Sequence, residues 1–402
     1  MRKFVNLNLN AMKIANGVLY IGADAQEQDL FEGQYILPEG MAYNSYLVKG
    51  EKTAIMDTAD EAVAAKWKAN LKDALEGRQP DFLVAHHMEP DHAALIAETL
   101  QEYPGCTLVT SAPALKMLGQ FFPGIDPKVQ VIKEGDTLDL GGGKTLRFFA
   151  APLVHWPEVM VSFLEEDGIL FSADAFGKFG ALGKCGFWGD EDDDWACEAR
   201  RYYFNICGKY GVQVQKLLGK VSGLDIKVIA PLHGPILREN LSYYLNLYNI
   251  WSSYGVETEG VFVAYGSMHG GTAEAALKIA DILKAQGCPK VATSDLSRDD
   301  MAEAVEDAFR YGKLILAAPT YDGGLFTPVH NFIHVLQAKG WTKRRVGLIE
   351  NGSWAPQAGR IMKDMFAQMK DVEVIDPVVT IKSRMNEADI PALESLASTI
   401  IE

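Results

Sequence analysis

The chain has 402 residues, 48% of them hydrophobic, which is enough apolar material to form two sizeable cores. Its formal net charge of -15 repels polyanions, which disfavours nucleic acids and anionic membrane surfaces as partners. No apolar run is long enough to cross a bilayer, and the segment from Met1 to Asn6 lacks the apolar stretch of a signal peptide. We therefore expect a cytoplasmic protein, and we interpret its five cysteines as free thiols.

The first part of the chain is predicted to mix strands with helices. Short apolar runs predict strands at residues 45–48, 53–57, 82–85, 107–110, 145–150, 169–172 and 226–230. The acidic run at 190–194 precedes an amphipathic stretch, 195–218, and we interpret it as a solvated helix start. The pattern changes near residues 252–255, so we place a first domain at 1–252 and a second at 256–402.

Strands and helices alternate regularly in the second part of the chain. The predicted strands are 260–265, 291–294, 314–318, 345–349 and 372–378. The predicted helices are 273–285, 301–311, 329–338 and 355–369, and a last one begins at Pro391. Five strands that alternate with helices predict an α/β fold with a doubly wound parallel sheet.

A cluster of metal-binding side chains follows the strand at 82–85 directly, in the segment His87-Met88-Glu89-Pro90-Asp91-His92. Alternate side chains of an extended segment share a face, so His87, Glu89 and Asp91 are expected to point together. His86 faces the opposite side, and we interpret it as a structural residue or as one that supports a ligand from behind rather than a ligand itself. A helix over 93–100 then turns His92 toward the site, and Asp91 can serve as both ligand and N-cap of that helix.

Three further candidate ligands follow predicted strands of the same domain: His155, Asp174 and His233. The carboxyl ends of strands are where such sheets bind ligands. The imidazoles and carboxylates of this set together are too many for one ion. The natural interpretation is a binuclear site whose two ions share a bridging ligand.

This arrangement resembles the metallo-β-lactamase fold, whose signature H-x-H-x-D-H is followed by histidine, aspartate and histidine. Here Glu89 replaces the second histidine, and its harder, anionic oxygen favours iron over zinc. H-x-E-x-D-H is the pattern of the flavodiiron proteins, in some of which the histidine that matches His92 is not a ligand. The resemblance implies an αββα sandwich with two iron ions, one bound by His87, Glu89 and His155, the other by Asp91, His92 and His233, with Asp174 as the bridge.

Three loops at strand ends in the second part predict a flavin site. The first combines hydroxyls, glycine N–H groups and a helix N-terminus into a phosphate nest, and it matches neither a Walker A loop nor G-x-G-x-x-G. The other two place Tyr321 and Trp354 where they can flank an aromatic ring. Each loop alone is ordinary turn chemistry, but together they favour FMN in a flavodoxin-like domain. The candidate residues are Ser267, Met268, His269, Gly270, Gly271, Thr272, Pro319, Thr320, Tyr321, Asp322, Gly323, Gly324, Asn351, Gly352, Ser353 and Trp354.

The resemblance to flavodiiron proteins covers nearly the whole chain and implies an oxidoreductase. Two ferrous ions and one reduced flavin hold four electrons, which can reduce dioxygen to water, and half of that store couples two nitric oxide molecules to nitrous oxide. No catalytic residue beyond the metal ligands is identifiable. The chain has no paired C-x-x-C sequences, so electrons are expected from outside, from a rubredoxin, a flavin reductase or reduced coenzyme F420. The family also implies a head-to-tail homodimer, or a dimer of dimers, in which the FMN of one subunit faces the diiron site of the other.

Two alternatives stay open at this point. The first is a binuclear zinc hydrolase with a regulatory flavodoxin domain, against which Glu89 argues and which metal analysis would identify. The second is an electron carrier with a vestigial metal site, which would require missing ligands. The preference between dioxygen and nitric oxide cannot be read from the ligand set.

Overall fold

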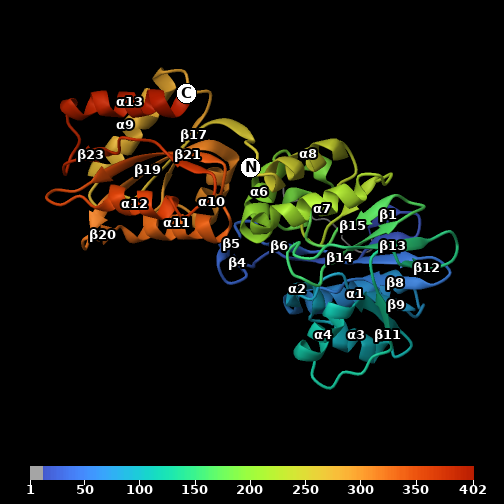
Figure 1. The fold of residues 1–402 in the computed structure, drawn as a ribbon. Helices are drawn as coiled ribbons and strands as arrows, with labels where there is room; N and C mark the ends of the chain where they lie inside the picture. The colour runs from blue at the N-terminus through green and yellow to red at the C-terminus, as the bar shows by residue number, and fades with distance from the viewer. Residues whose placement is uncertain (1–11) are drawn as a thin grey trace. The chain divides into compact units, whose positions relative to one another are not determined.

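The structure is a computed structural model that describes residues 12–402, so the segment from Met1 to Asn6 lies outside the described residues. The chain divides into two compact units (Figure 1). Unit 1 comprises Met1–Tyr203 and Val212–Tyr248, and unit 2 comprises Phe204–Gly211 and Asn249–Glu402. Among the described residues, no helix combines the length and the apolar character that crossing a membrane requires.

Unit 1 contains two β-sheets. The first has the order β1 (Lys13–Ala15), β2 (Val18–Tyr20), β7 (Tyr46–Lys49), β8 (Thr53–Met56), β9 (Phe82–Val84), β10 (Thr107–Ser111) and β11 (Val129–Ile132). The second has the order β12 (Thr137–Asp139), β13 (Thr145–Ala150), β14 (Met160–Leu164), β15 (Ile169–Phe171) and β16 (Val228–Ala230). Two short pairs stand beside them: β3 (Ala23–Ala25) with β6 (Met41–Tyr43), and β4 (Leu30–Phe31) with β5 (Tyr35–Ile36).

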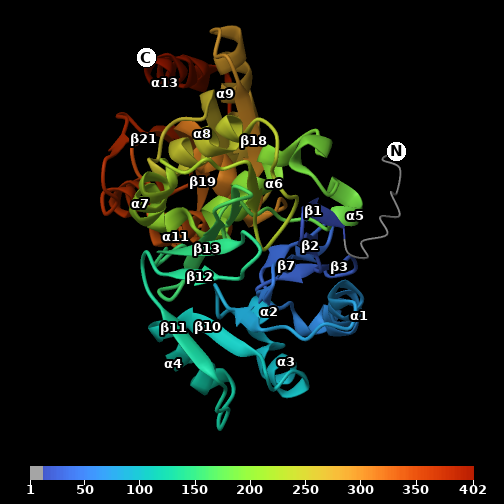
Figure 2. The ribbon, with the colours of Figure 1, turned by 90° about the vertical axis from the view of Figure 1, so that its right-hand side faces the viewer.

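The two sheets of unit 1 share one apolar core. Met56 and Val84 of the first sheet belong to the same buried cluster as Phe148 and Ile169 of the second. Helices α1 (Ala64–Leu75), α3 (Ile96–Glu102) and α4 (Ala112–Phe121) lie along the outer side of the first sheet (Figures 1 and 2). On the side of the second sheet lies α7 (Gly211–Val221), whose Lys220 donates to the carbonyl of Ala150 at 2.6 Å. The predicted αββα sandwich is confirmed.

The amphipathic stretch predicted at 195–218 is interrupted. Helix α6 (Trp195–Ile206) ends, a short 3₁₀ turn at Gly208–Tyr210 follows, and α7 begins at Gly211. A Cβ on Gly211 would lie 2.3 Å from the carbonyl oxygen of Ser252, so this close approach requires glycine. The interpretation of the acidic run before α6 as solvated is wrong for one member, because Asp192 forms a buried ion pair with Lys178.

Unit 2 is a doubly wound sheet, as predicted. Its parallel strands have the order β18 (Val291–Asp295), β17 (Thr258–Tyr265), β19 (Tyr311–Tyr321), β21 (Arg344–Asn351) and β22 (Val372–Val374). Two short strands are added, β20 (Gly324–Leu325) on β19 and β23 (Val379–Ile381) on β21. The predicted strand at 372–378 ends early, at Val374, and β23 begins only beyond it, at Val379; Pro377 between them cannot donate a ladder hydrogen bond.

Helices cover both faces of the sheet in unit 2. Helices α9 (Gly271–Ala285) and α13 (Ile390–Ile401) pack together, and their apolar residues form one buried cluster with the sheet. Helices α10 (Met301–Arg310), α11 (Thr327–Ala338) and α12 (Ala358–Phe366) cover the other face (Figure 1). The chain turns to opposite faces after β17 and β19, which opens a crevice at their carboxyl ends.

Candidate metal centre and ligand cavity

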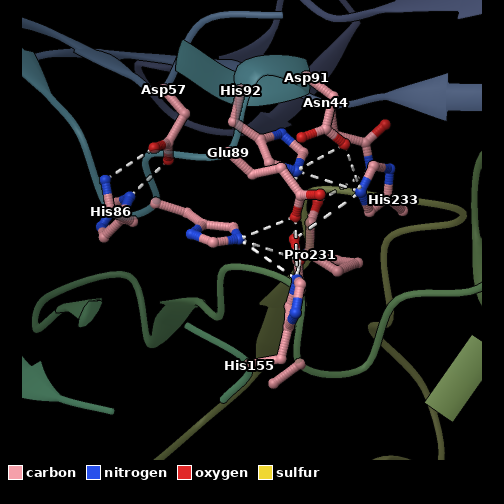
Figure 3. Close-up of polar contacts among 12 residues, drawn as sticks. Asn44, Asp57, His86, Glu89, Asp91, His92, His155, Pro231 and His233 are labelled. Carbon is pink, nitrogen blue, oxygen red and sulfur yellow. Dashed lines mark hydrogen bonds and ion pairs between the residues drawn. The ribbon is translucent and has the colours of Figure 1, made fainter. Parts of the chain in front are cut away.

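The candidate metal ligands converge at the carboxyl ends of four strands in unit 1. The segment that begins at His87 follows β9, His155 follows β13, Asp174 follows β15 and His233 follows β16. Their ligand atoms form two clusters, with His87, Glu89, His155 and Asp174 in the first and Asp91, His92 and His233 in the second. Figure 3 shows Glu89 and His155 pointing toward Asp91, His92 and His233.

The first cluster brings two imidazoles and two carboxylates together. The Nε2 atom of His155 lies 3.0 Å from a carboxylate oxygen of Glu89 and 3.1 Å from Oδ2 of Asp174. The Nε2 atoms of His87 and His155 are 3.4 Å apart. Such spacing between atoms of different residues matches donors that surround one ion, since metal–nitrogen and metal–oxygen bonds are about 2.0–2.2 Å long.

The second cluster has the same character. The Nε2 atoms of His92 and His233 are 3.1 Å apart, and each lies 3.2 Å from Oδ2 of Asp91. Oδ1 of Asp174, the oxygen that does not face the first cluster, lies 3.2 Å from Nε2 of His92. Asp174 therefore presents one oxygen to each cluster, which is the geometry of a bridging carboxylate.

These carboxylates are buried without the partners that buried carboxylates normally have. Neither oxygen of Asp91 or Asp174 accepts a hydrogen bond among the described residues, although both side chains are at least 90% buried. An ionised carboxylate in such a place is costly unless a cation or donor compensates it. The carboxylates and imidazole Nε2 atoms of the two clusters are suited to two divalent cations, one in each cluster. The two cations would have different sets of ligands.

The expected role of Asp91 as a helix N-cap is wrong. The helix that follows the ligand segment is α2 (Pro90–Ala93), and Glu89 occupies its N-cap position. Pro90 stands at the first helical position, where its fixed φ starts the helix early. Asp91 is thus already helical, and this turn sends it to the second cluster while His87 and Glu89 stay with the first. The predicted helix at 93–100 is also divided, since α3 begins only at Ile96.

Groups behind the ligands fix their orientation. His233 Nδ1 lies 2.9 Å from the carbonyl oxygen of Ala42, and His87 Nδ1 lies 2.8 Å from Oε1 of Glu158. His86 belongs to a separate buried network, with Nδ1 2.6 Å from Asp57 and Nε2 2.8 Å from Ser162, and Figure 3 shows it turned away from the clusters toward Asp57. Sequence reasoning missed Glu158, which stands in a loop without a motif.

Burial and neighbouring charges shift the pKa values of the ligands in opposite directions. Burial alone would lower the pKa of His155, but the nearby carboxylates of Asp174 and Glu89 raise it to about 9. Burial also opposes the charged forms of Asp174 and Glu89, yet the surrounding imidazoles hold the pKa of both carboxyls below their ordinary values. Without metal, these shifts favour a protonated His155 beside the ionised carboxylates of Glu89 and Asp174, and a metal ion would displace that proton.

Unit 2 contains a cavity of about 690 Å³ at the carboxyl ends of β17, β19 and β21. All three predicted loops line it, with two exceptions: Gly270 forms the N-cap of α9 and Gly324 belongs to β20. Sequence reasoning missed three lining residues, of which Ala355 and Gln357 continue the third loop and Ser383 comes from a distant segment.

The cavity combines a polar end with exposed aromatic side chains. The hydroxyl oxygen of Ser267 accepts hydrogen bonds from the N–H groups of Gly270 and Ala273 at 3.1 and 3.2 Å, which leaves its proton free to donate to a ligand. A Cβ on Gly271 would lie 2.4 Å from the carbonyl oxygen of Ser383, so position 271 requires glycine. Trp354, 92% exposed, and Tyr321, 45% exposed, offer apolar surface to a ring. These features match a ligand with a phosphate and a planar aromatic ring.

Comparisons with known proteins agree with both halves of this description. The family model of the ODP family beta lactamase matches residues 41–234. The anaerobic nitric oxide reductase flavorubredoxin from Escherichia coli is 27% identical over 351 residues, which cover 85% of this chain and 72% of that protein.

Solved structures extend the likeness over nearly the whole chain. The rubredoxin oxygen:oxidoreductase from Desulfovibrio gigas has a TM-score of 0.91 and 25% identity, covering 97% of this chain and 98% of that one. A variant of the flavo di-iron protein from Thermotoga maritima has a TM-score of 0.84 and 26% identity, covering 96% of each chain. With the two metal-ligand clusters in unit 1 and the cavity in unit 2, the chain is similar to flavodiiron proteins over nearly its whole length.

Proposed function

We propose that this protein reduces dioxygen to water, nitric oxide to nitrous oxide, or both, at a diiron centre that receives electrons from FMN. The observation that supports it most is the pair of clusters joined by Asp174, in which Glu89 stands where zinc hydrolases of this fold have a histidine. The names of the relatives from E. coli and D. gigas describe both chemistries.

The proposed ligands lie in a first domain at residues 1–252 and the flavin residues in a second at 256–402. His87, Glu89 and His155 would hold the first iron and Asp91, His92 and His233 the second, while Asp174 offers one oxygen to each cluster. When bound, the irons act as Lewis acids for a diatomic gas and supply electrons, which the flavin replaces.

The residues of unit 1 orient the centre and limit the access of water. The imidazoles of His87, His92 and His233 are fully buried, whereas Glu89 is 12% and His155 is 9% exposed. A small gas is therefore proposed to enter beside Glu89 and His155. The His233 segment is held from behind by Asn44, whose amide donates to the carbonyls of Pro231 and Gly234 at 2.9 and 2.8 Å.

The residues of unit 2 are proposed to bind FMN through the 690 Å³ cavity. Ser267 and the N-terminus of α9 face the phosphate, because the first N–H groups of a helix have no partner within it. The hydroxyl oxygen of Thr320 accepts hydrogen bonds from the N–H groups of Gln357 and Ala358 at 2.9 and 3.1 Å, which fixes the loop around Tyr321. Tyr321 and Trp354, which line the cavity, would flank the ring.

The partners and the assembly are also proposals. The electron donor is external, a rubredoxin, a flavin reductase or reduced coenzyme F420, and the protein acts as a head-to-tail homodimer or a dimer of such dimers. The five free cysteines support a reducing compartment such as the cytoplasm.

The decisive experiment is anaerobic stopped-flow spectroscopy of the fully reduced protein mixed with dioxygen or with nitric oxide. We expect the flavin absorbance to return within the lifetime of one turnover with at least one of the gases. Metal analysis of the same sample should give two irons and one FMN per chain. Two zinc ions per chain with esterase or nuclease activity, and no flavin oxidation by either gas, would support the hydrolase instead, which the relatives do not favour.

A further inference from the structure

The two halves of the metal centre differ in what lies behind their imidazoles. In the first cluster, Nδ1 of His87 donates to Oε1 of Glu158 at 2.8 Å, and the Glu158 side chain is fully buried. In the second cluster, Nδ1 of His233 faces only the neutral carbonyl of Ala42 at 2.9 Å. Nδ1 of His92 is buried and has no hydrogen-bond partner in the part of the chain that the structure describes.

Glu158 is held in place as a charged group. Its Oε1 accepts a second hydrogen bond, from the N–H of Met88 at 2.9 Å. Two donors that point at one oxygen, the Nδ1–H of His87 and the N–H of Met88, stabilise the carboxylate form of Glu158. A carboxylate behind a metal-bound imidazole fixes its tautomer and increases its basicity, which a carbonyl does less strongly.

The same residue makes the charge of the two positions unequal. The first position has Glu89, one oxygen of Asp174 and, behind His87, the charge of Glu158. The second has Asp91 and the other oxygen of Asp174. In a buried site with little screening, one additional negative charge favours a cation at the first position.

We propose that the two metal positions load in a fixed order, with the position of His87, Glu89 and His155 filled first and held more tightly, and that Glu158 is the positioning residue that sets this order. The inference rests on the binuclear centre proposed above. It adds that the second ion, beside His92, is the one lost first when metal is limiting.

A variant of Glu158 that keeps the shape of the side chain but removes its charge tests whether Glu158 acts through its charge or only through packing of its loop. In Glu158→Gln, the amide oxygen can still accept from His87 and Met88, so the geometry is retained while the charge is lost. Ser162→Ala is the matched control, because Ser162 contacts the neighbouring His86, which belongs to neither cluster, at 2.8 Å. The probe is Co²⁺, titrated into the metal-free full chain and followed by calorimetry and by its visible absorption.

For the wild type we expect two resolved binding steps of one ion each. Glu158→Gln should weaken the first step by about 10- to 100-fold, with the second step changed by less than about threefold, whereas Ser162→Ala should leave both unchanged. Two wild-type steps of equal affinity, or a Glu158→Gln variant that weakens both steps alike or neither, would overturn the inference.

A second pair of variants tests the order even where Glu158→Gln fails to fold. Asp91→Asn should still bind one Co²⁺ with the affinity of the wild-type first step, and Glu89→Gln should lose that step. The reverse result would overturn the inference. A wild-type chain that binds fewer than two ions per chain would instead contradict the proposed binuclear centre, so the two failures are distinguishable.

Discussion

At the scale of single residues, we expect Glu89 to bias the centre toward iron. Its carboxylate lies 3.0 Å from Nε2 of His155 and 3.3 Å from Nε2 of His87, so it stands among the donors of the first cluster. Replacing it with histidine exchanges an anionic oxygen for a neutral nitrogen, which favours zinc over iron. We predict that Glu89→His lowers the iron-to-zinc ratio several-fold in protein purified from medium containing both metals, as measured by elemental analysis.

Glu98→His is the control for this substitution. Glu98 lies in α3 and pairs with Lys68 at 2.5 Å on the surface, so the same exchange of side chains there should not alter the metals. FMN content should equal that of the wild type in both variants, because the cavity belongs to unit 2. An unchanged iron-to-zinc ratio in Glu89→His would contradict the role given to this carboxylate.

His155 makes metal binding dependent on pH. In the metal-free protein its pKa is raised to about 9 from an ordinary value of 6.5, so it is protonated at neutral pH. A metal ion requires the neutral imidazole and must displace the proton. The apparent affinity should therefore rise with pH up to about 9, and calorimetry in two buffers of different ionisation enthalpy should detect proton release at pH 7. Binding without proton release would show that the site is already deprotonated.

The same shift affects the stability of the metal-free protein, with the opposite dependence on pH. A folded-state pKa above the unfolded value stabilises the fold at pH values below 6.5, and this contribution is lost as the pH rises through 9. Thermal melts of the metal-free chain should thus show decreasing stability between these limits.

At the scale of elements, the junction between β17 and α9 is predicted to bind the phosphate of FMN. Gly271 packs against the backbone of Ser383, and an added Cβ would lie 2.4 Å from that carbonyl oxygen. Gly271→Ala must therefore displace one of two loops that line the cavity. We predict a loss of FMN affinity of at least about tenfold, measured by fluorescence titration, with metal content unchanged.

Gly119→Ala provides a chemically identical change without the clash. Gly119 lies in α4, where an added Cβ has no neighbour within 4 Å, so its helix propensity should improve by about 0.5–1 kcal/mol. If Gly271→Ala and Gly119→Ala both bound FMN as tightly as the wild type does, the phosphate would have to bind elsewhere.

The elements that could be predicted from sequence were those with a strong local pattern. The alternating strands and helices of unit 2 and the ligand-bearing ends of β9, β15 and β16 follow from apolar runs and the residues after them. The division of the ligand segment between two clusters could not be predicted, because it depends on Pro90 starting a helix at once. Glu158 and Ser383 also escaped, since each meets its partners only through the folding of distant segments.

At the scale of the whole molecule, the metal ligands and the flavin cavity belong to different units of one chain, each with its own buried core. A chain folded in this way can load its two cofactors independently. We therefore expect variants of one site to retain the cofactor of the other, which allows the two defects to be combined in a single assembly.

A mixed dimer distinguishes transfer between subunits from transfer within one. Asp174→Asn removes the bridging charge and should lose metal while it keeps FMN, whereas Gly271→Ala keeps metal and loses FMN. In the proposed head-to-tail dimer, a mixed assembly of the two variants would place the FMN of the first subunit opposite the intact metal centre of the second. Differently tagged chains, co-expressed and purified through both tags, should then show about half of the wild-type activity, although each parent dimer is inactive. If the mixed dimers contained one FMN and one pair of metal ions each and were still inactive, electrons would have to pass within a single subunit.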